Sequence, residues 1–212
     1  MKIIGFFKKH PLAFALSYLV LHFLIFFILE AVITSDYYII HSPIDDVIPF
    51  CEYFIVPYLL WFLYVPAIVL YLIKYDRNNY WKLALTLFGS NLICLVLYMI
   101  FPNGVMPKAP IEETTNIFQQ AVNILYANDT PTNVCPSMHV LDTLAAHVAL
   151  STSKTMDSHP FIKAGSFVFL ILICVATVTL KQHSIIDVFA AFILFAIMAF
   201  FAYKKPAQKQ CA

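Results

Sequence analysis

Long apolar runs separated by short polar turns make up most of the chain. A helix needs roughly 20 predominantly apolar residues to cross a hydrocarbon core about 30 Å thick. The pattern therefore predicts an all-α fold, a polytopic integral membrane protein with six transmembrane helices in one bundle and a single domain over residues 1–212. The predicted spans are residues 11–34, 52–73, 81–101, 138–153, 160–180 and 184–203. The fourth is the least apolar, because Asp142 and His147 interrupt it.

One connection between the spans is long, residues 102–136. Apolar residues recur in it near the 3.6-residue period of a helix, with polar residues between them: Ile111, Phe118, Val122, Leu125 and Tyr126. This spacing predicts a short amphipathic helix, and we expect the helix to lie on the membrane surface. The predicted bundle therefore carries an amphipathic insert over residues 102–136, on the extracytoplasmic side.

Composition supports a membrane protein and excludes other classes. Hydrophobic residues make up 61% of the 212 and charged residues 12%, about half the charged share of a typical soluble domain. A chain of this size cannot bury so much apolar surface in one water-soluble core, so the expected partner is the lipid bilayer. The net charge is +1, and no basic stretch indicates nucleic acid. The first apolar run lacks a small-residue cleavage site, so we interpret it as a span and not as a signal peptide.

The distribution of basic residues predicts the orientation, because cytoplasmic loops carry an excess of Lys and Arg. With the N-terminus in the cytoplasm, 11 of the 13 basic residues fall on the cytoplasmic side: Lys2, Lys8, Lys9, Lys74, Arg77, Lys82, Lys154, Lys163, Lys204, Lys205 and Lys209. The two that fall outside are Lys108 and Lys181. We therefore expect both termini in the cytoplasm. A basic residue kept against this bias needs a reason, and phosphate binding supplies one.

Two short clusters carry residue types that catalysis uses. The sequence PSMH (residues 136–139) stands at the outer start of the fourth span, and KQHSIID (residues 181–187) stands at the outer start of the sixth. Between them the chain crosses the membrane and returns. His139 and His183 therefore lie on the same side at similar depth, although 44 positions separate them. Lys108, just after the third span, belongs to that side as well.

The start of the fourth span suits phosphate binding. Ser137 precedes a helix, so the backbone N–H groups of Met138 and His139 are free at the positive end of the helix dipole. Lys108 and Lys181 would neutralise the phosphoryl oxygens as negative charge builds on them. We therefore expect phosphate to be held by these two lysines, by Ser137 and by the Met138 backbone.

The start of the sixth span suits nucleophilic catalysis. His183 and Asp187 are four positions apart on one helix, so the carboxylate can accept a proton from one ring nitrogen and leave the other free as a nucleophile. His139 can then protonate the leaving oxygen and later activate water. The expected catalytic residues are His183, His139 and Asp187.

These motifs resemble those of the type 2 phosphatidic acid phosphatase superfamily, which also includes lipid phosphotransferases. The family signatures are K-x6-R-P, P-S-x-H and S-R-x5-H-x3-D on a six-helix membrane bundle. Ser137 and His139 match the second signature, and His183 and Asp187 match the third. In motif order and spacing the resemblance covers about residues 102–190. It implies that His183 is the nucleophile, that a phosphohistidine forms, and that neither a metal nor a cofactor takes part.

The chain departs from the signatures at several positions. Met138 stands where phosphatases of the family have glycine, which is similar to the branch containing sphingolipid phosphotransferases. Residues 176–177 (AT) replace the Ser-Arg pair of the third signature. In the first signature Lys108 stands for the Arg and Phe101 occupies the position of the upstream Lys. Lys181 is expected to substitute in part for the missing Arg residues, as a point charge rather than a bidentate fork.

The same residues allow other assignments. A metal site would take as its ligands His139, Asp142, His183 and Asp187, although two nearby lysines oppose a cation. A hydrolase triad would use Ser137 with His183 and Asp187, but this serine lacks the glycine-rich turn that exposes a nucleophile. Asp142 is a candidate second-layer residue that orients His139 or pairs with Lys181.

The sequence thus predicts an enzyme that hydrolyses a phosphate monoester or diphosphate of a membrane lipid at the extracytoplasmic face, and we favour a bacterial cytoplasmic membrane. Phosphatidate, phosphatidylglycerol phosphate and polyprenyl diphosphate are all open as substrates. With an acceptor alcohol in place of water, the enzyme would be a sphingolipid-synthase-like phosphotransferase. A catalytically silent scaffold is a third hypothesis, against which the retained site residues argue. The sequence also leaves open the oligomeric state and whether Cys51 pairs with Cys135.

Overall fold

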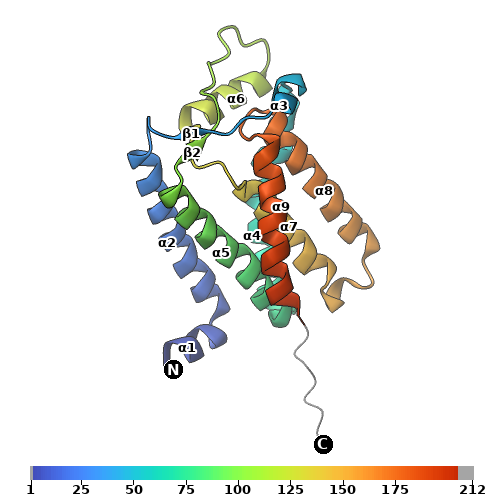
Figure 1. Cartoon of the computed structure of the whole chain (residues 1–212). Coiled ribbons are helices and arrows are strands. Elements are labelled where there is room, and N and C mark those ends of the chain that lie inside the picture. Colours follow the sequence, from blue (N-terminus) through green and yellow to red (C-terminus); the bar gives the residue numbers. More distant parts are fainter. Residues whose placement is uncertain (1, 205–212) are drawn as a thin grey trace, which may run out of the picture.

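Each of the six apolar runs forms a helix. The computed structural model of the chain describes residues 2–204, and its helices stand side by side in one bundle (Figure 1). The helices formed by the six runs are α2 (Pro11–Val32), α4 (Ile55–Tyr75), α5 (Arg77–Ile100), α7 (Met138–Ser151), α8 (Pro160–Thr179) and α9 (Ile185–Tyr203). Their ends lie within a few residues of the predicted ends, so the expectation of an all-α fold is confirmed.

Local sequence explains several helix ends. Pro11 occupies the first position of α2, where a missing N–H costs nothing. Asp76 ends α4 and caps α5, because its carboxylate accepts a hydrogen bond from the N–H of Asn79 at 3.1 Å. At α9, Ser184 and Asp187 form a capping box. The Ser184 hydroxyl accepts from a backbone N–H in the first turn of the helix, and the Asp187 carboxylate accepts from the backbone N–H of Ser184. This last cap also orders Asp187 for the site described below.

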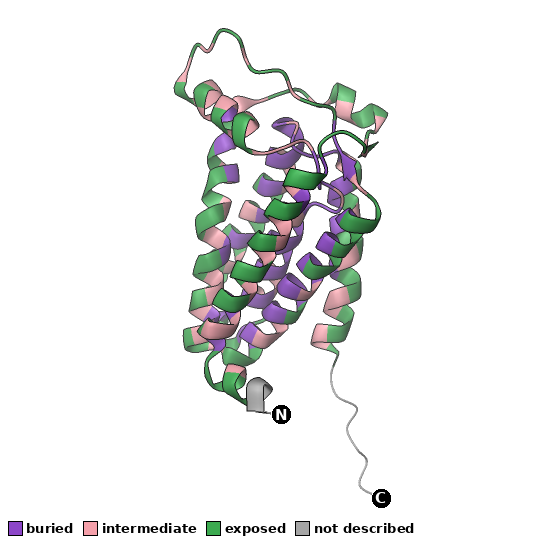
Figure 2. Cartoon of the chain, turned by 90° about the vertical axis from the view of Figure 1, so that its left-hand side faces the viewer, coloured by how far each residue is buried: buried purple, intermediate pink, exposed green. Residues whose placement is uncertain are grey.

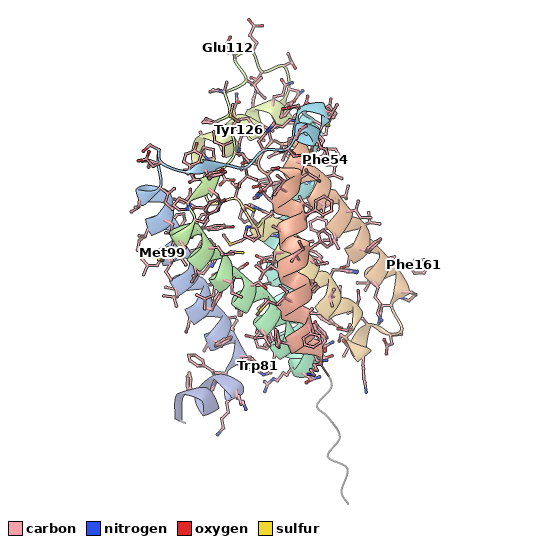
Figure 3. The ribbon with its side chains drawn as sticks, in the orientation of Figure 1. Phe54, Trp81, Met99, Glu112, Tyr126 and Phe161 are labelled. Carbon is pink, nitrogen blue, oxygen red and sulfur yellow. The ribbon has the colours of Figure 1, made fainter. Side chains whose placement is uncertain are left out.

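The outer surface of the bundle is apolar. Among the described residues, five helices are long and apolar enough to cross a membrane: α2, α5, α8, α9 and the segment Glu52–Tyr75, in which the 3₁₀ turn η1 (Glu52–Phe54) precedes α4. Large apolar side chains such as Leu63, Phe161 and Ile193 are exposed on these helices. Figure 2 shows exposed positions along the helices, and Figure 3 shows Phe161 at the outside of the bundle. An exposed apolar surface of this extent is a membrane-contacting surface. The protein is therefore an all-α membrane protein.

The helix α7 differs from the other five. It has 14 residues, or about 21 Å of helix at 1.5 Å per residue, which is shorter than a typical span. It packs against α4, α5, α8 and α9, and most of its side chains are buried. Because these helices shield α7 from lipid, it tolerates the buried carboxyl of Asp142. His147 also finds a partner there, with its Nδ1 2.8 Å from the Oγ of Ser166.

A short helix that the apolar pattern does not predict precedes the bundle. This helix, α1 (Lys2–Lys9), ends just before His10, after which α2 starts in another direction (Figure 1). Lys8 and Lys9 occupy its last turn. Two of the lysines used to predict the orientation, Lys205 and Lys209, lie outside the described residues.

The connection between α2 and α4 and the connection between α5 and α7 form a cap at the end of the bundle away from α1 (Figure 1). The cap contains β1 (Tyr38–Ile39), α3 (Pro43–Val47), β2 (Asn103–Gly104) and α6 (Ile117–Asn128), and β1 pairs with β2 in parallel. The acidic tip at Glu112 lies farthest from the bundle (Figure 3). A further 3₁₀ turn, η2 (Lys154–Met156), follows α7.

Gly104 is required where the two connections cross. It pairs with β1 and also forms a bridge to Thr132. A Cβ at this position would lie 2.5 Å from the backbone oxygen of Pro131 and 2.6 Å from the ring of Tyr37. Both distances are too short for any side chain, so the crossing depends on glycine.

The predicted amphipathic helix is present as α6, with one difference in extent. It begins only at Ile117, after Asn116 caps it by accepting from the N–H of Gln119 at 3.0 Å. Ile111 precedes the helix and is tied to Asn123 by two hydrogen bonds of 2.9 Å. The apolar face of α6, with Val122 fully buried, packs against the ends of α4 and α8. The regularly spaced apolar residues of this segment therefore pack against the protein. The sequence had suggested that they face a membrane surface.

Candidate active site

The predicted catalytic residues meet in a small cavity at the capped end of the bundle. The cavity has a volume of about 50 Å³, and His139 and His183 both line it. The remaining lining residues are Phe26, Tyr98, Asp129, Thr130, Thr132, Asn133, Val134, Met138 and Gln182. A cavity of this volume has room for a few water-sized groups. Its size therefore suits a small polar group, such as a phosphate.

The hydrogen bond expected between His183 and Asp187 is present. Nδ1 of His183 lies 3.2 Å from Oδ2 of Asp187, which also accepts from the N–H of Ser184 at 2.9 Å. Asp187 is fully buried, and His183 is 9% exposed. The carboxylate favours the tautomer with its proton on Nδ1, which leaves Nε2 with a lone pair. The hydrogen bond to Asp187 thus fixes the His183 ring and leaves its second nitrogen unprotonated.

The turn between α8 and α9 directs His183 toward the cavity. The backbone oxygen of Thr177 accepts from the N–H groups of Gln182 and His183, both at 3.0 Å. Lys181, inside this turn, has a φ of 54°, a left-handed conformation that is uncommon for residues other than glycine. The turn reverses the chain in a few residues and brings both Gln182 and His183 to the cavity wall.

Lys181 does not take the phosphate-binding place that we predicted for it. Its Nζ donates to the backbone oxygens of Asp45 at 2.8 Å and Ile48 at 2.5 Å. The side chain of Asp45 in turn accepts from the Oγ of Ser184 at 2.6 Å and the N–H of Ile185 at 2.8 Å. Lys181 therefore fastens α3 to the start of α9. The prediction fails because the left-handed backbone at Lys181 turns its side chain toward α3, which residue spacing does not reveal.

His139 is packed between two aromatic rings and faces His183. Its ring centroid lies 4.6 Å from that of Tyr58 and 4.6 Å from that of Trp61, both on α4, and 5.7 Å from that of His183. Its Nδ1 is buried and has no hydrogen-bond partner among the described residues. Packing thus holds the ring, and the residue lines the cavity.

Ser137 starts α7 and links the two catalytic segments. Its Oγ accepts from the N–H of Val140 at 3.5 Å, and its own N–H donates to the backbone oxygen of Asp187 at 3.1 Å. Because the cap takes the N–H of Val140, the N–H groups of Met138 and His139 have no partner within the helix. These two groups are the donors expected for phosphate.

Two residues that the sequence analysis missed hold the segment before α7. Asn103 is buried, and its Oδ1 accepts from the N–H groups of Val134 at 3.2 Å and Cys135 at 2.7 Å. The hydroxyl of Tyr98 donates to the backbone oxygen of Pro136 at 2.6 Å. Both residues are 30 or more positions from their partners, and no motif marks them. They place the start of α7, and with it His139.

Lys108 reaches the site from the cap. Its Nζ donates to the Oε1 of Gln182, the neighbour of His183, and lies 5.1 Å from the centre of the Tyr126 ring. Burial lowers the pKa of Lys108 to about 8, and the negative charge of Asp129 acts against this shift. Of the two lysines predicted to bind phosphate, Lys108 is the one near the site: it does not line the cavity, but it contacts the lining residue Gln182.

Asp129 is a carboxylate at the cavity that the sequence analysis did not select. It follows α6, lines the cavity with both histidines, and accepts from the hydroxyl of Tyr58 at 3.2 Å through Oδ2. Burial raises the pKa of Asp129, while the positive charge of Lys108 acts to lower it. Its position in the sequence, just after the predicted amphipathic helix, did not mark it as a site residue. Only the packing of α6 onto the bundle brings it near the histidines.

The alternative assignments gain no support from this geometry. The hydroxyl of Ser137 is buried in the helix cap rather than exposed as a nucleophile. Within residues 2–204, no group of three or more His, Cys, Asp or Glu side chains is arranged to hold a metal ion. In the same range, Asp142 makes no hydrogen bond to His139 or Lys181. Cys51 and Cys135 are free thiols.

Comparison of the chain with protein-family models, with curated proteins and with solved structures gave no match. The cavity and the residues that line it are therefore the features from which a function can be inferred.

Proposed function

We propose that this protein is an integral-membrane lipid phosphatase that hydrolyses a phosphate monoester or diphosphate of a membrane lipid through a phosphohistidine. The observation that carries the proposal is the pair of histidines on one cavity. Nδ1 of His183 is hydrogen-bonded to the buried carboxylate of Asp187. The ring centroids of His183 and His139 lie 5.7 Å apart. This arrangement supplies a nucleophile and a separate proton carrier. It agrees with the type 2 phosphatidic acid phosphatase resemblance of the motifs.

In the first step, Nε2 of His183 attacks the phosphorus and forms a P–N bond. The P–O bond to the lipid breaks, and the departing oxygen takes a proton from His139. Asp187 stabilises the positive charge that develops on the His183 ring. The products are a phosphohistidine and a lipid alcohol, or a lipid monophosphate when the substrate is a diphosphate.

In the second step, water replaces the lipid oxygen. His139, now neutral, takes a proton from the water as its oxygen attacks the phosphorus. The P–N bond breaks, inorganic phosphate leaves, and His183 returns to its starting state with Nδ1 on Asp187. Each histidine ends the cycle as it began it.

The oxygens of the phosphoryl group need positive partners throughout. The N–H groups of Met138 and His139 point from the start of α7, where the helix dipole is positive. Lys108 adds one ammonium at the neighbouring wall, beside Gln182. These donors take the place of the arginines that the family signatures contain and this chain lacks.

We further propose six membrane crossings, namely the five long apolar helices and α7, and a site on the extracytoplasmic side. The bias of 11 basic residues against 2 supports this orientation. α7 is enclosed by the other helices, so it does not need a full apolar span of its own. The capped end of the bundle would then face away from the cytoplasm, in a bacterial cytoplasmic membrane.

Asp129 supports transfer to an alcohol as a second candidate function. Its carboxylate lines the cavity beside both histidines, where it would repel a phosphate dianion but accept a hydrogen bond from a hydroxyl. An acceptor alcohol bound there would stand where water stands in hydrolysis. The enzyme would then be a lipid phosphotransferase.

The test is a substrate panel with the purified full-length protein. We expect release of inorganic phosphate from at least one of phosphatidate, phosphatidylglycerol phosphate and a polyprenyl diphosphate, inhibition by vanadate, and unchanged activity in excess EDTA. Transfer of the phospho-group to an added alcohol, with little free phosphate, would favour the second candidate. Activity that EDTA removes and zinc restores would contradict the proposal in favour of a metal site.

The pH dependence should report on Lys108. Because its pKa is lowered to about 8, the ammonium is present below pH 7 and is lost as the pH rises through 8. We expect KM for the lipid phosphate to be flat below pH 7 and to rise above pH 8, by about 10-fold or more, which corresponds to the loss of one charge-assisted hydrogen bond. The Lys108→Arg variant should move this rise to higher pH, because a guanidinium stays charged. The same profile in both proteins would contradict this role.

A further inference from the structure

A second hollow lies at the other end of the bundle from the histidines. It is open, has a volume of about 460 Å³, and lies where the α1–α2 corner meets the junction of α4 and α5. Its walls are mainly apolar and include Phe6, Leu16 and Ile73. Three basic or titratable side chains complete the lining: Lys9, His10 and Arg77. A surface that combines an apolar wall with a basic rim matches one phospholipid, with its chains on the wall and its phosphate at the rim.

The charges at this rim are not neutralised by the protein. No Asp or Glu lines the hollow, and within residues 2–204 neither Lys9 nor Arg77 forms an ion pair. Asp76, which precedes Arg77, is occupied by hydrogen bonds from the N–H of Asn79 at 3.1 Å and the Oγ of Ser153 at 2.7 Å. By contrast Lys163 has its own partner, Asp157, at 3.0 Å. The hollow therefore combines two free positive charges with the absence of an acid.

The apolar wall continues the exposed apolar surface of α2, which makes lipid the expected occupant of the hollow. Leu16 is 53% exposed and lies on α2, one of the membrane-crossing candidates. Lys9 and Arg77 stand at the ends of the apolar segments, at the level where lipid phosphates lie. Each basic group near a membrane surface strengthens binding to an anionic lipid by about fivefold. Two such groups therefore discriminate strongly between anionic and zwitterionic lipids.

We propose that this hollow is a binding site for one anionic phospholipid, whose phosphate lies between Lys9, His10 and Arg77 and whose acyl chain runs along Leu16 and Ile73. The site is separate from the catalytic cavity and does not rest on the proposed phosphatase activity. It requires only the bilayer environment. The general excess of basic residues at this end is the competing explanation, and it predicts no dependence on which of the lysines and arginines is removed.

The experiment measures quenching of Trp81, which lies near this end of the bundle (Figure 3). The chain has two tryptophans, so a Trp61→Phe background leaves Trp81 alone as the reporter. The full-length protein is reconstituted in vesicles that contain brominated phosphatidylglycerol or brominated phosphatidylcholine. We expect the first to quench with an association constant about 10- to 30-fold higher, as two free basic groups would give.

The matched variants each remove two positive charges from the same end of the bundle. Lys9→Gln with Arg77→Gln should reduce the preference to about twofold or less, whereas Lys154→Gln with Lys204→Gln should keep it. A conservative pair, Lys9→Arg with Arg77→Lys, should also keep it, which separates loss of charge from loss of fold. An equal loss in both glutamine pairs, or no preference in the parent protein, would overturn the proposal.

Discussion

The His183→Ala variant is expected to lose both lipid cleavage and the covalent phospho-enzyme. The physical reason is that the attacking Nε2 is gone, and no other described group on the cavity combines a free nitrogen with the buried carboxylate that holds His183. Removal of a nucleophile that acts with its partners as a unit costs on the order of 10⁴-fold or more in kcat. Phosphate release from the best substrate of the panel, and acid-labile label retained on the protein, measure the two losses.

His147→Ala is the matched control for this prediction. His147 lies on α7 but hydrogen-bonds to Ser166 and does not line the cavity, so its loss should leave kcat within about threefold. Asp187→Asn should fall between the two, because the geometry is kept while the tautomer of His183 and the stabilisation of its charge are weakened. A phospho-enzyme that still forms in His183→Ala, or that maps to Ser137, would refute the assigned roles.

The His139→Ala variant should separate the two steps. On a lipid alkoxide, which is a poor leaving group, the loss of the general acid is expected to reduce the rate by about 10²–10⁴-fold. With p-nitrophenyl phosphate the leaving group needs no proton, so the first step should proceed at a rate closer to that of the parent protein. The phosphohistidine should then accumulate, because the base that activates water is missing.

Rapid-quench measurement of p-nitrophenolate and of protein-bound phosphate tests this separation. We expect a burst of about one p-nitrophenolate per protein, followed by slow turnover. His139→Gln is the control for packing, since it occupies part of the space between Tyr58 and Trp61 but cannot act as a base. An equal loss on both substrates, without a burst, would assign His139 a purely structural role.

The six helices formed by the apolar runs were predictable because each run is a strong local signal. An apolar run of about 20 residues has few alternatives to a helix in a membrane, and the ends fall at residues such as Pro11 and Asp76 that start or cap helices. The structure agrees with these segments to within a few residues. The shortness of α7 had a signal too, since Asp142 and His147 interrupt its run. That signal reflects an enclosed helix, which only packing explains.

The candidate site was predictable where its residues lie at fixed helical spacing. His183 and Asp187 were expected on one helix; His183 instead lies in the turn just before α9, but the four-residue spacing still brings its ring to the Asp187 carboxylate. The sequence could not predict where the Lys181 side chain lies, because the left-handed backbone at this residue directs the side chain toward α3. Asp129 and Asn103 were missed for another reason. Their contacts are set by how the cap folds back over the bundle, and no periodicity records that.

One bond in the site has a bearing on how such proteins diverge. The N–H of Ser137 donates to the backbone oxygen of Asp187, so a main-chain hydrogen bond joins the start of α7, which carries His139, to the first turn of α9, which follows His183. Among the standard residues only proline lacks the backbone N–H. Under the proposed function, side chains around the cavity could be exchanged, and with them the preferred headgroup or acceptor, while this main-chain contact between the two histidine-bearing segments stays in place.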